Sequence, residues 1–309
     1  MFRESWARDS TFRHNNVMTS KRQVNIGNMA IGGGAPVSVQ SMTNTDTRDV
    51  EATLGQIRSL AAYGCEIIRV AVPDEAAALA LAGIAAESPL PVVADIHFKA
   101  KLAVDSIAAG AAGLRINPGN IGGREKVKSV VEAARAASVP IRIGVNAGSL
   151  PKDMLSMAEG EPVKALVETV LRYVNLFEDL GFEDFKISAK SSSVSETIDA
   201  NLEIAGRIDY PIHLGVTEAG TKWTGSIRSA VGIGALLAQG VGDTIRVSLT
   251  GDPVEEMRAC YEILPPLGLR QHGPGTISAQ SCARTTTDAA PTAPQRPRQP
   301  RVCASGLTA

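Results

Sequence analysis

Residues 92–117, VVADIHFKAKLAVDSIAAGAAGLRIN, contain the pattern that decides the fold. Two short apolar runs, Val92–Ile96 and Gly113–Ile116, are separated by a longer amphipathic stretch. Short apolar runs that alternate with amphipathic segments are typical of βα units, whose strands pair in parallel. The segment therefore predicts one strand, one helix and the next parallel strand.

The same alternation continues in both directions, from Val37 to about Leu264, with helical patterns such as Val50–Tyr63 and Ser226–Gln239 after the strands. The candidate strands are Val37–Ser41, Ile67–Ala71, Val92–Ile96, Gly113–Ile116, Ile141–Val145, Phe185–Ser188, Ile212–Gly215 and Thr244–Val247. Eight units in about 230 residues match a closed (βα)8 TIM barrel, an α/β fold of usually about 250 residues. A doubly wound open sheet is the alternative, but it usually has fewer strands and a glycine-rich dinucleotide turn that we do not find.

The segments outside the repeats differ in character. We expect a flexible N-terminus over residues 1–21, a barrel domain over 22–269 and a disordered, proline-rich tail within 270–309. Arg22–Ile26 and Ala30–Gly34 predict a hairpin that plugs one mouth of the barrel. Gly64 and Gly181 follow helical patterns at the position where a residue in the left-handed backbone conformation commonly ends a helix, and Pro253 is compatible with the first turn of a helix.

Composition bounds the class of protein. Hydrophobic residues make up 44% and charged residues 20%, with a net charge of −1, which fits a compact α/β enzyme and gives no field that would attract nucleic acid or a membrane surface. No apolar stretch is long enough to cross a bilayer, and the N-terminus lacks the apolar core of a signal peptide. The four scattered cysteines indicate neither a disulfide framework nor a complete metal site, so we expect a cytoplasmic protein.

Polar residues gather where the predicted strands end, and the carboxyl ends of the strands form the active-site face of such a barrel. They include Gln40–Asn44, Arg69, Asp95–His97, Arg115–Asn120, Arg142, Asn146, Lys186–Ser188, Lys190, His213–Glu218, Arg246 and Ser248.

The four arginines and two lysines of this set need anions, because an unpaired buried charge is costly. Structural pairing with carboxylates such as Asp95 and Glu218 is one explanation. A diphosphate held by converging arginine forks and lysine ammonium groups is the other, and it accounts better for the whole set. The loops that begin at Asn117 and Asn146 add glycines and backbone N–H donors that suit phosphate oxygens.

Other polar candidates have simpler alternatives. Glu218 is positioned to protonate a leaving hydroxyl, or else it pairs with a neighbouring arginine. His97 and His213 are more simply hydrogen-bonded barrel histidines than ligands. Cys65 and Cys260, both placed inside helical patterns, are most simply small core residues.

Taken together, these phrases resemble the IspG/GcpE family of 4-hydroxy-3-methylbut-2-enyl diphosphate synthases, from roughly Arg22 to Leu269. The matching phrases are Val37–Thr45, Ala94–Phe98, Leu114–Gly122, Arg142–Leu150, His213–Gly220 and Arg246–Leu249. The resemblance implies an oxidoreductase of the non-mevalonate isoprenoid pathway that opens 2-C-methyl-D-erythritol 2,4-cyclodiphosphate reductively with two electrons from flavodoxin or ferredoxin. It implies Glu218 as proton donor and a substrate site built from Arg69, Arg115, Arg142, Asn146, Lys190, Arg246 and Ser248. The residues themselves add Asn117 and Lys186 to that site.

The family also implies a C-terminal domain with a [4Fe-4S] cluster on three cysteines and a glutamate, and a homodimer in which this domain caps the partner's barrel. Here the family's Cys-x-x-Cys is replaced by Ala279-Gln280-Ser281-Cys282, which leaves Cys282 as a single metal ligand and 270–309 as a remnant of that domain. We therefore expect that this chain does not bind the cluster. A shifted reading frame near Ala279 is the leading explanation, and a cluster domain on another chain is the second.

Two rival functions remain open. Lys186 on the sixth strand would form a Schiff base in an aldolase-type barrel. A degenerate barrel that binds diphosphates without turnover is the non-catalytic rival, and a pterin-binding barrel is an analogy of fold alone.

Overall fold

The computed structural model describes residues 20–270, and its centre is a parallel barrel of eight strands. The barrel strands are β3 (Ser38–Met42), β4 (Ile67–Ala71), β5 (Val92–Ile96), β6 (Gly113–Ile116), β7 (Ile141–Asn146), β8 (Phe185–Lys190), β9 (His213–Leu214) and β10 (Thr244–Ile245). Their order is β8-β7-β6-β5-β4-β3-β10-β9, and a parallel bridge between Ile187 and Ile212 joins the two ends. The sheet is therefore closed, and the predicted (βα)8 fold is confirmed.

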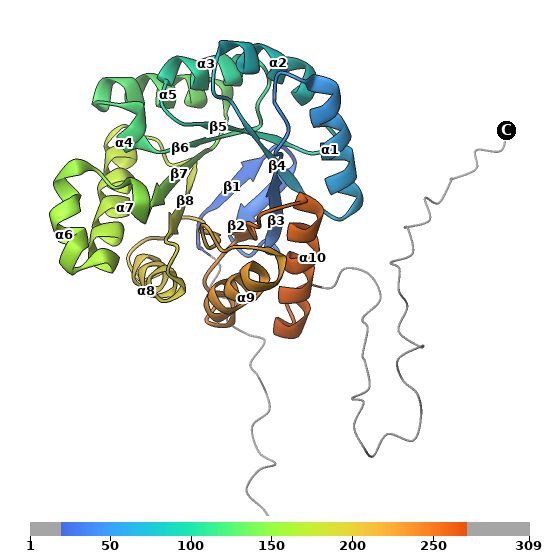
Figure 1. The fold of residues 1–309 in the computed structure, drawn as a ribbon. Coiled ribbons are helices and arrows are strands. Elements are labelled where there is room, and N and C mark those ends of the chain that lie inside the picture. The colour runs from blue at the N-terminus through green and yellow to red at the C-terminus, as the bar shows by residue number, and fades with distance from the viewer. Residues whose placement is uncertain (1–19, 271–309) are drawn as a thin grey trace, which may run out of the picture. The chain divides into compact units, whose positions relative to one another are not determined.

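Helices form an outer ring around the strands (Figure 1). They are α1 (Val50–Ala62), α2 (Glu75–Glu87), α3 (Ala100–Ala108), α4 (Pro118–Ile121), α5 (Arg124–Ala137), α6 (Leu155–Gly160), α7 (Pro162–Asp179), α8 (Val194–Ala205), α9 (Lys222–Ala238) and α10 (Pro253–Ile263), with short 3₁₀ turns η1 (Ala147–Ser149), η2 (Lys152–Met154) and η3 (Pro265–Leu267). Asp49, Asp74 and Ser193 begin helices by accepting a hydrogen bond from a first-turn N–H, which satisfies an otherwise unpaired donor.

A β-hairpin closes the amino-terminal mouth of the barrel. β1 (Gln23–Ile26) pairs antiparallel with β2 (Met29–Gly32), slightly shorter than predicted. Its buried side chains pack in one cluster with Ile67 and Val93, which lie near the starts of β4 and β5. The predicted plug is confirmed, and because it covers the amino ends of the strands, the opposite mouth is left to carry a site.

Most of the helix ends expected from glycine and proline positions are confirmed. Gly64 and Gly181 have φ values of 88° and 66°, and Pro253 is the first residue of α10. Cys65 and Cys260 are buried as predicted, but Cys65 precedes β4 and lies outside any helix, because α1 already ends at Ala62. The predictions for residues 1–19 and 271–309, including the single ligand Cys282, fall outside the described residues.

The strands divide their side chains between two environments. Residues such as Ile68, Ile143 and Ile187 face outward into the core beneath the helices. The alternate residues face the barrel axis, and in a tilted barrel each layer takes four of them from alternate strands. The register gives, from floor to mouth, Ile67, Gly113, Lys186 and Thr244; then Gln40, Val93, Arg142 and His213; then Arg69, Arg115, Ser188 and Arg246; then Met42, Asp95, Gly144 and Gly215; and finally Ala71, Asn117, Lys190 and Ser248.

Candidate anion-binding site

The middle of the barrel holds a carboxylate between two arginines. Arg69 Nε and Arg115 Nη1 each lie 3.2 Å from an oxygen of Asp95, whose side chain is 2% exposed. Burial alone would raise the pKa of Asp95, but Arg69, His97 and Arg115 lower it well below its usual value. Asp95 therefore stays ionised and fixes the two guanidinium groups at the level where the barrel opens.

Arg246 is held by a carboxylate from outside the barrel. Glu256 on α10, 3% exposed, accepts hydrogen bonds from Arg246 and from Ser41 Oγ, at 3.2–3.4 Å. Glu256 was not among the site residues predicted from the sequence. A signal was present, because Glu256 shares the core-facing side of α10 with Cys260 and Ile263, where a charged residue needs a buried partner.

Two cations next to these pairs, Arg142 and Lys190, form no ion pair with a carboxylate among residues 20–270. Arg142 is 2% exposed and Lys190 is 6% exposed. Burial is the main cause that lowers the pKa of both groups, and the neighbouring cations lower it further. The pKa of Lys190 falls well below the ordinary lysine value. A guanidinium is not deprotonated in proteins, so Arg142 keeps a positive charge that Asp95 only partly offsets.

Glycines make room for these cations. A Cβ built on Gly144 would lie 2.6 Å from Arg115 Nε, and one built on Gly215 would lie 2.6 Å from Lys190 Nζ. Both distances are well inside van der Waals contact, so any larger residue would displace the cation. The two glycines fill one layer with Met42 and Asp95, and they allow Arg115 and Lys190 to converge on the axis.

The rim of the mouth carries the remaining predicted residues. Asn117 follows β6 and caps α4, Asn146 ends β7, and Ser248 follows β10. Glu218 is exposed in the loop after β9 with φ of 53°, a conformation that non-glycine residues rarely adopt and that marks candidate functional positions.

The two histidines, His97 and His213, lie in different environments. His97 is at the mouth, 47% exposed, with Nε2 3.7 Å from Asp95 Oδ2. His213 is fully buried, with Nδ1 3.4 Å from Thr244 Oγ1, while its Nε2 is among the buried atoms without a hydrogen-bond partner in the described part of the chain. The prediction of a hydrogen-bonded barrel histidine thus describes only one ring nitrogen of His213.

Lys186 lies apart from the mouth. It belongs to the floor layer and lies four positions before Lys190 on β8, which is ~13 Å at about 3.3 Å per residue. The predicted site residues therefore form two groups, one at the mouth and one deep in the barrel.

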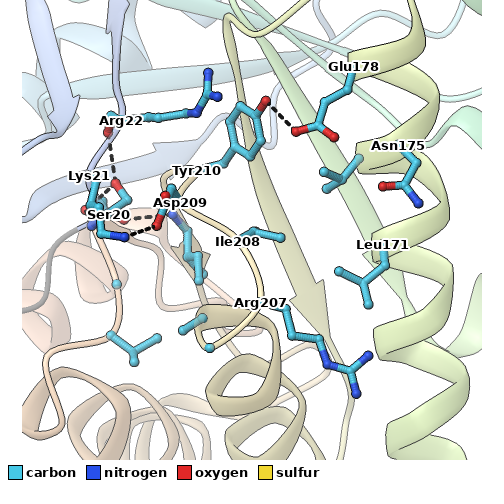
Figure 2. Close-up of a pocket in the computed structure, with 17 residues that line it drawn as sticks. Ser20, Lys21, Arg22, Leu171, Asn175, Glu178, Arg207, Ile208, Asp209 and Tyr210 are labelled. Atoms are coloured by element: carbon cyan, nitrogen blue, oxygen red, sulfur yellow. Dashed lines mark hydrogen bonds and ion pairs between the residues drawn. The ribbon is translucent and has the colours of Figure 1, made fainter.

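A cavity of about 660 Å³ lies at the amino ends of the strands, opposite the mouth. Figure 2 shows Ser20, Lys21 and Arg22 on one side of it and Glu178 on the helix across from them. Its polar groups bind one another: Tyr210 donates to Glu178 over 2.9 Å, and the Arg22 guanidinium lies over the Tyr210 ring. Lys21 and Asp209, which also line the cavity, form an ion pair over 2.9 Å, so several of its polar side chains are already paired with one another.

No His, Cys, Asp and Glu side chains within residues 20–270 come together as a group that would hold a metal ion. Burial raises the pKa of the thiols of Cys65 and Cys260 to about 12, so both stay protonated and are poor ligands. No helix between residues 20 and 270 is long and apolar enough to span a membrane.

Fold and site together define a (βα)8-barrel protein whose interior is lined by buried cationic side chains. The profile of the family described as the GcpE TIM-barrel domain matches residues 21–261. The chain belongs to the GcpE family, as the resemblance predicted.

Named relatives support the same family assignment. The chain is 57% identical to the 4-hydroxy-3-methylbut-2-en-1-yl diphosphate synthase (flavodoxin) of Geobacter sulfurreducens, over 85% of this chain and 74% of that protein. It is 54% identical to the protein of that name from Lawsonia intracellularis, over 88% and 76%.

Solved structures show a likeness of fold alone. A Yersinia pestis dihydropteroate synthase in a sulfonamide drug complex is 12% identical with a TM-score of 0.58, over 81% of this chain and all of that one. A 3-dehydroquinate dehydratase of Geobacillus kaustophilus is 15% identical with a TM-score of 0.55, over 81% and 99%.

Proposed function

We propose that this protein acts as a 4-hydroxy-3-methylbut-2-enyl diphosphate synthase in the non-mevalonate isoprenoid pathway. Its substrate would be 2-C-methyl-D-erythritol 2,4-cyclodiphosphate, and flavodoxin or ferredoxin would supply two electrons. The names of relatives at 51–57% identity support the reaction. The cytoplasm is the compartment that fits these partners.

The observation that carries the proposal is the excess of positive charge inside the barrel. The interior layers hold six cationic side chains, and two carboxylates, Asp95 and Glu256, contact them. If all are ionised, the excess is four positive charges (six minus two). A cyclic diphosphate is a dianion that arginine forks bind well in a site shielded from water.

The barrel domain, residues 22–269, would bind and orient the substrate. Arg69, Arg115 and Arg246 form one layer, with Arg142 beneath it and Lys190 above it, so a diphosphate on the barrel axis meets donors from several strands. The rim residues Asn117, Asn146 and Ser248 would bind hydroxyl oxygens on the carbon chain of the substrate or the outer oxygens of its phosphates. Glu218 would donate a proton to the departing hydroxyl at the mouth.

The described residues do not fit an iron–sulfur cluster, because the two cysteines among them, Cys65 before β4 and Cys260 on α10, are buried and protonated. The described residues therefore offer no ligands for a cluster that would deliver electrons to the substrate. The cluster that the family resemblance implies would belong to a separate cluster domain, and electron delivery would take place there.

We also propose that a second copy of the chain docks on the α9–α10 face. This face holds a groove of about 650 Å³ flanked by exposed Trp223 and Ile227. Its edges carry both signs of charge, including a 2.7 Å ion pair of Lys222 with Glu255. Mixed charges around an apolar centre suit an isologous two-fold contact, in which each lysine can also face the partner's glutamate.

One observation favours the Schiff-base alternative: burial and the nearby Arg142 lower the pKa of Lys186 well below its ordinary value, as a nucleophilic amine requires. Its floor position weighs against it, because the layers of Arg142 and of Arg69 lie between Lys186 and the mouth. Borohydride trapping of a carbonyl adduct at Lys186 would favour the aldolase-type barrel.

The proposal is tested with the full chain by calorimetric titration of the cyclic diphosphate, followed by a turnover assay with dithionite after iron and sulfide are added. We expect micromolar binding that weakens as salt increases. Binding without turnover would assign the chain to the diphosphate-binding barrel that lacks catalysis. Absence of binding would contradict the proposal.

A further inference from the structure

A thioether lies among the arginines at the mouth, and the proposed function gives it no role. Met42 Sδ lies 2.9 Å from Arg69 Nη2, 3.1 Å from Arg69 Nε and 3.9 Å from Arg246 Nη1. A thioether sulfur is only a weak hydrogen-bond acceptor. Two guanidinium groups therefore direct donors at an atom that satisfies them poorly.

Met42 lies on the path from the opening of the barrel to these arginines. It is the last residue of β3 and pairs in register with Arg69 on β4, and both side chains face the barrel axis. Its layer, shared with Asp95 and two glycines, is the next one toward the mouth from the layer of Arg69 and Arg246. The Met42 residue is partly exposed, and the plug hairpin closes the opposite end of the barrel. Small molecules therefore reach the sulfur through the mouth.

The surroundings of the sulfur are strongly cationic. Burial lowers the pKa of Arg69 to about 10, and the like charges of Arg246 and Arg115 act in the same direction. Asp95 opposes this change, but its carboxylate is shared between Arg69 and Arg115. A stronger acceptor at the position of the sulfur would gain charge-assisted hydrogen bonds from two arginines.

We propose that Met42 is a modification site, at which a hydroperoxide oxidises the thioether to a sulfoxide that occupies Arg69 and Arg246 and weakens diphosphate binding. Oxidation turns a flexible apolar side chain into a polar one, and the new oxygen is a far better acceptor than the sulfur. The inference rests on the proposed function, because the two arginines are groups that it assigns to the diphosphate. It adds oxidative control of the same site.

The step needs only the thioether and the peroxide. A sulfur lone pair bonds to one peroxide oxygen and the O–O bond breaks. The second oxygen leaves as hydroxide, takes up the proton of the transferred oxygen and becomes water. The sulfur is oxidised by two electrons and the peroxide is reduced by two, so no metal is required.

Peptide mass spectrometry of the full chain after hydrogen peroxide treatment tests the modification itself. We expect one added oxygen on Met42, while Met257, which is fully buried, stays reduced. Met157 on α6 is partly exposed and serves as the comparison for accessibility. A Met42 that stays reduced while Met157 is oxidised would overturn the proposal.

Calorimetric titration with inorganic pyrophosphate, before and after oxidation, tests the consequence. We expect a Kd at least about 10-fold weaker after oxidation, as the loss of one charge-assisted hydrogen bond to the ligand would give. If the untreated chain binds pyrophosphate and oxidation at Met42 leaves Kd unchanged, this inference fails and the proposed function stands. If the untreated chain does not bind, the proposed function fails and the inference fails with it.

Three variants separate Met42 from oxidation elsewhere in the chain. Met42→Leu removes the sulfur and should make Kd insensitive to peroxide, whereas the matched control Met157→Leu should keep the full peroxide effect. Met42→Gln places an amide oxygen near the position of the sulfoxide oxygen and should weaken pyrophosphate binding without any peroxide. An equal loss of affinity on peroxide treatment of Met42→Leu and the wild type would show that another residue is responsible and overturn the proposal.

Discussion

Substitution Gly144→Ala tests whether the convergence of cations on the barrel axis creates the binding site. The added methyl group would lie 2.6 Å from Arg115 Nε and 3.0 Å from its Nη2. Because Arg115 is buried and hydrogen-bonded to Asp95 over 3.2 Å, it has to move by several tenths of an ångström, and the contact with Asp95 breaks.

The size of the effect follows from two contributions. Overpacking of a dense interior costs about 1–3 kcal/mol of unfolding free energy. Loss of one well-placed charged hydrogen bond to the ligand costs about 1.5–3 kcal/mol, which is roughly a 10- to 100-fold weaker Kd. We therefore expect both stability and affinity to fall.

The assay is a calorimetric titration of cyclic diphosphate combined with urea unfolding. Gly55→Ala is the matched control, because Gly55 lies in α1 with nothing within 4 Å of a built Cβ. It should stabilise the helix by up to about 1 kcal/mol and leave Kd unchanged. A Gly144→Ala protein that binds as tightly as the wild type would refute the assignment of Arg115 to the ligand.

Three further predictions concern the charges and the surface. Glu256→Gln should lower the unfolding free energy by about 3–5 kcal/mol in urea, because Arg246 loses its buried partner, whereas Glu255→Gln should cost under about 1 kcal/mol; equal effects would contradict the pairing. Because the pKa of Lys190 in the folded chain is lowered below its ordinary 10.5, the unfolded chain binds more protons between the two values, and stability without ligand should rise with pH there. An anion bound at the mouth should raise the pKa of Lys190 again, so that ligand binding takes up protons. Calorimetry in buffers of different ionisation enthalpy measures this proton uptake. An undiminished uptake in Lys190→Met would contradict the assignment to Lys190. Trp223→Glu should convert a dimer into a monomer in light scattering after size exclusion, and an unchanged mass would exclude the α9–α10 face.

Sequence patterns predicted the fold because the barrel is built from local repeats. Each β-branched run formed a strand, and the glycines and Pro253 stand at the ends of helices as predicted. The shortest strands, β9 and β10, were predicted two residues longer than observed, at four residues each against two. The residues that follow these two strands continue the strand pattern in the sequence. Where the strand pairing stops depends on how the barrel closes, and no local sequence pattern encodes that closure.

The site was only partly predictable, because depth along the barrel axis depends on register. Sequence alone placed Lys186 and Lys190 in one cationic group, since both alternate toward the same face of a strand. The pairing of β7 with β8 and of β8 with β9 shows which layer each joins, Lys186 at the floor and Lys190 at the mouth. Glu256 reaches Arg246 from a helix, and that contact is a tertiary one.

The most direct test of the central claim is a crystal structure of the full chain with the cyclic diphosphate. We expect its two phosphorus atoms on the barrel axis at the carboxyl ends of the strands, within contact of Arg69, Arg115 and Arg246. Density instead in the cavity lined by Tyr210 and Glu178, or none in the barrel at saturating ligand, would contradict the account.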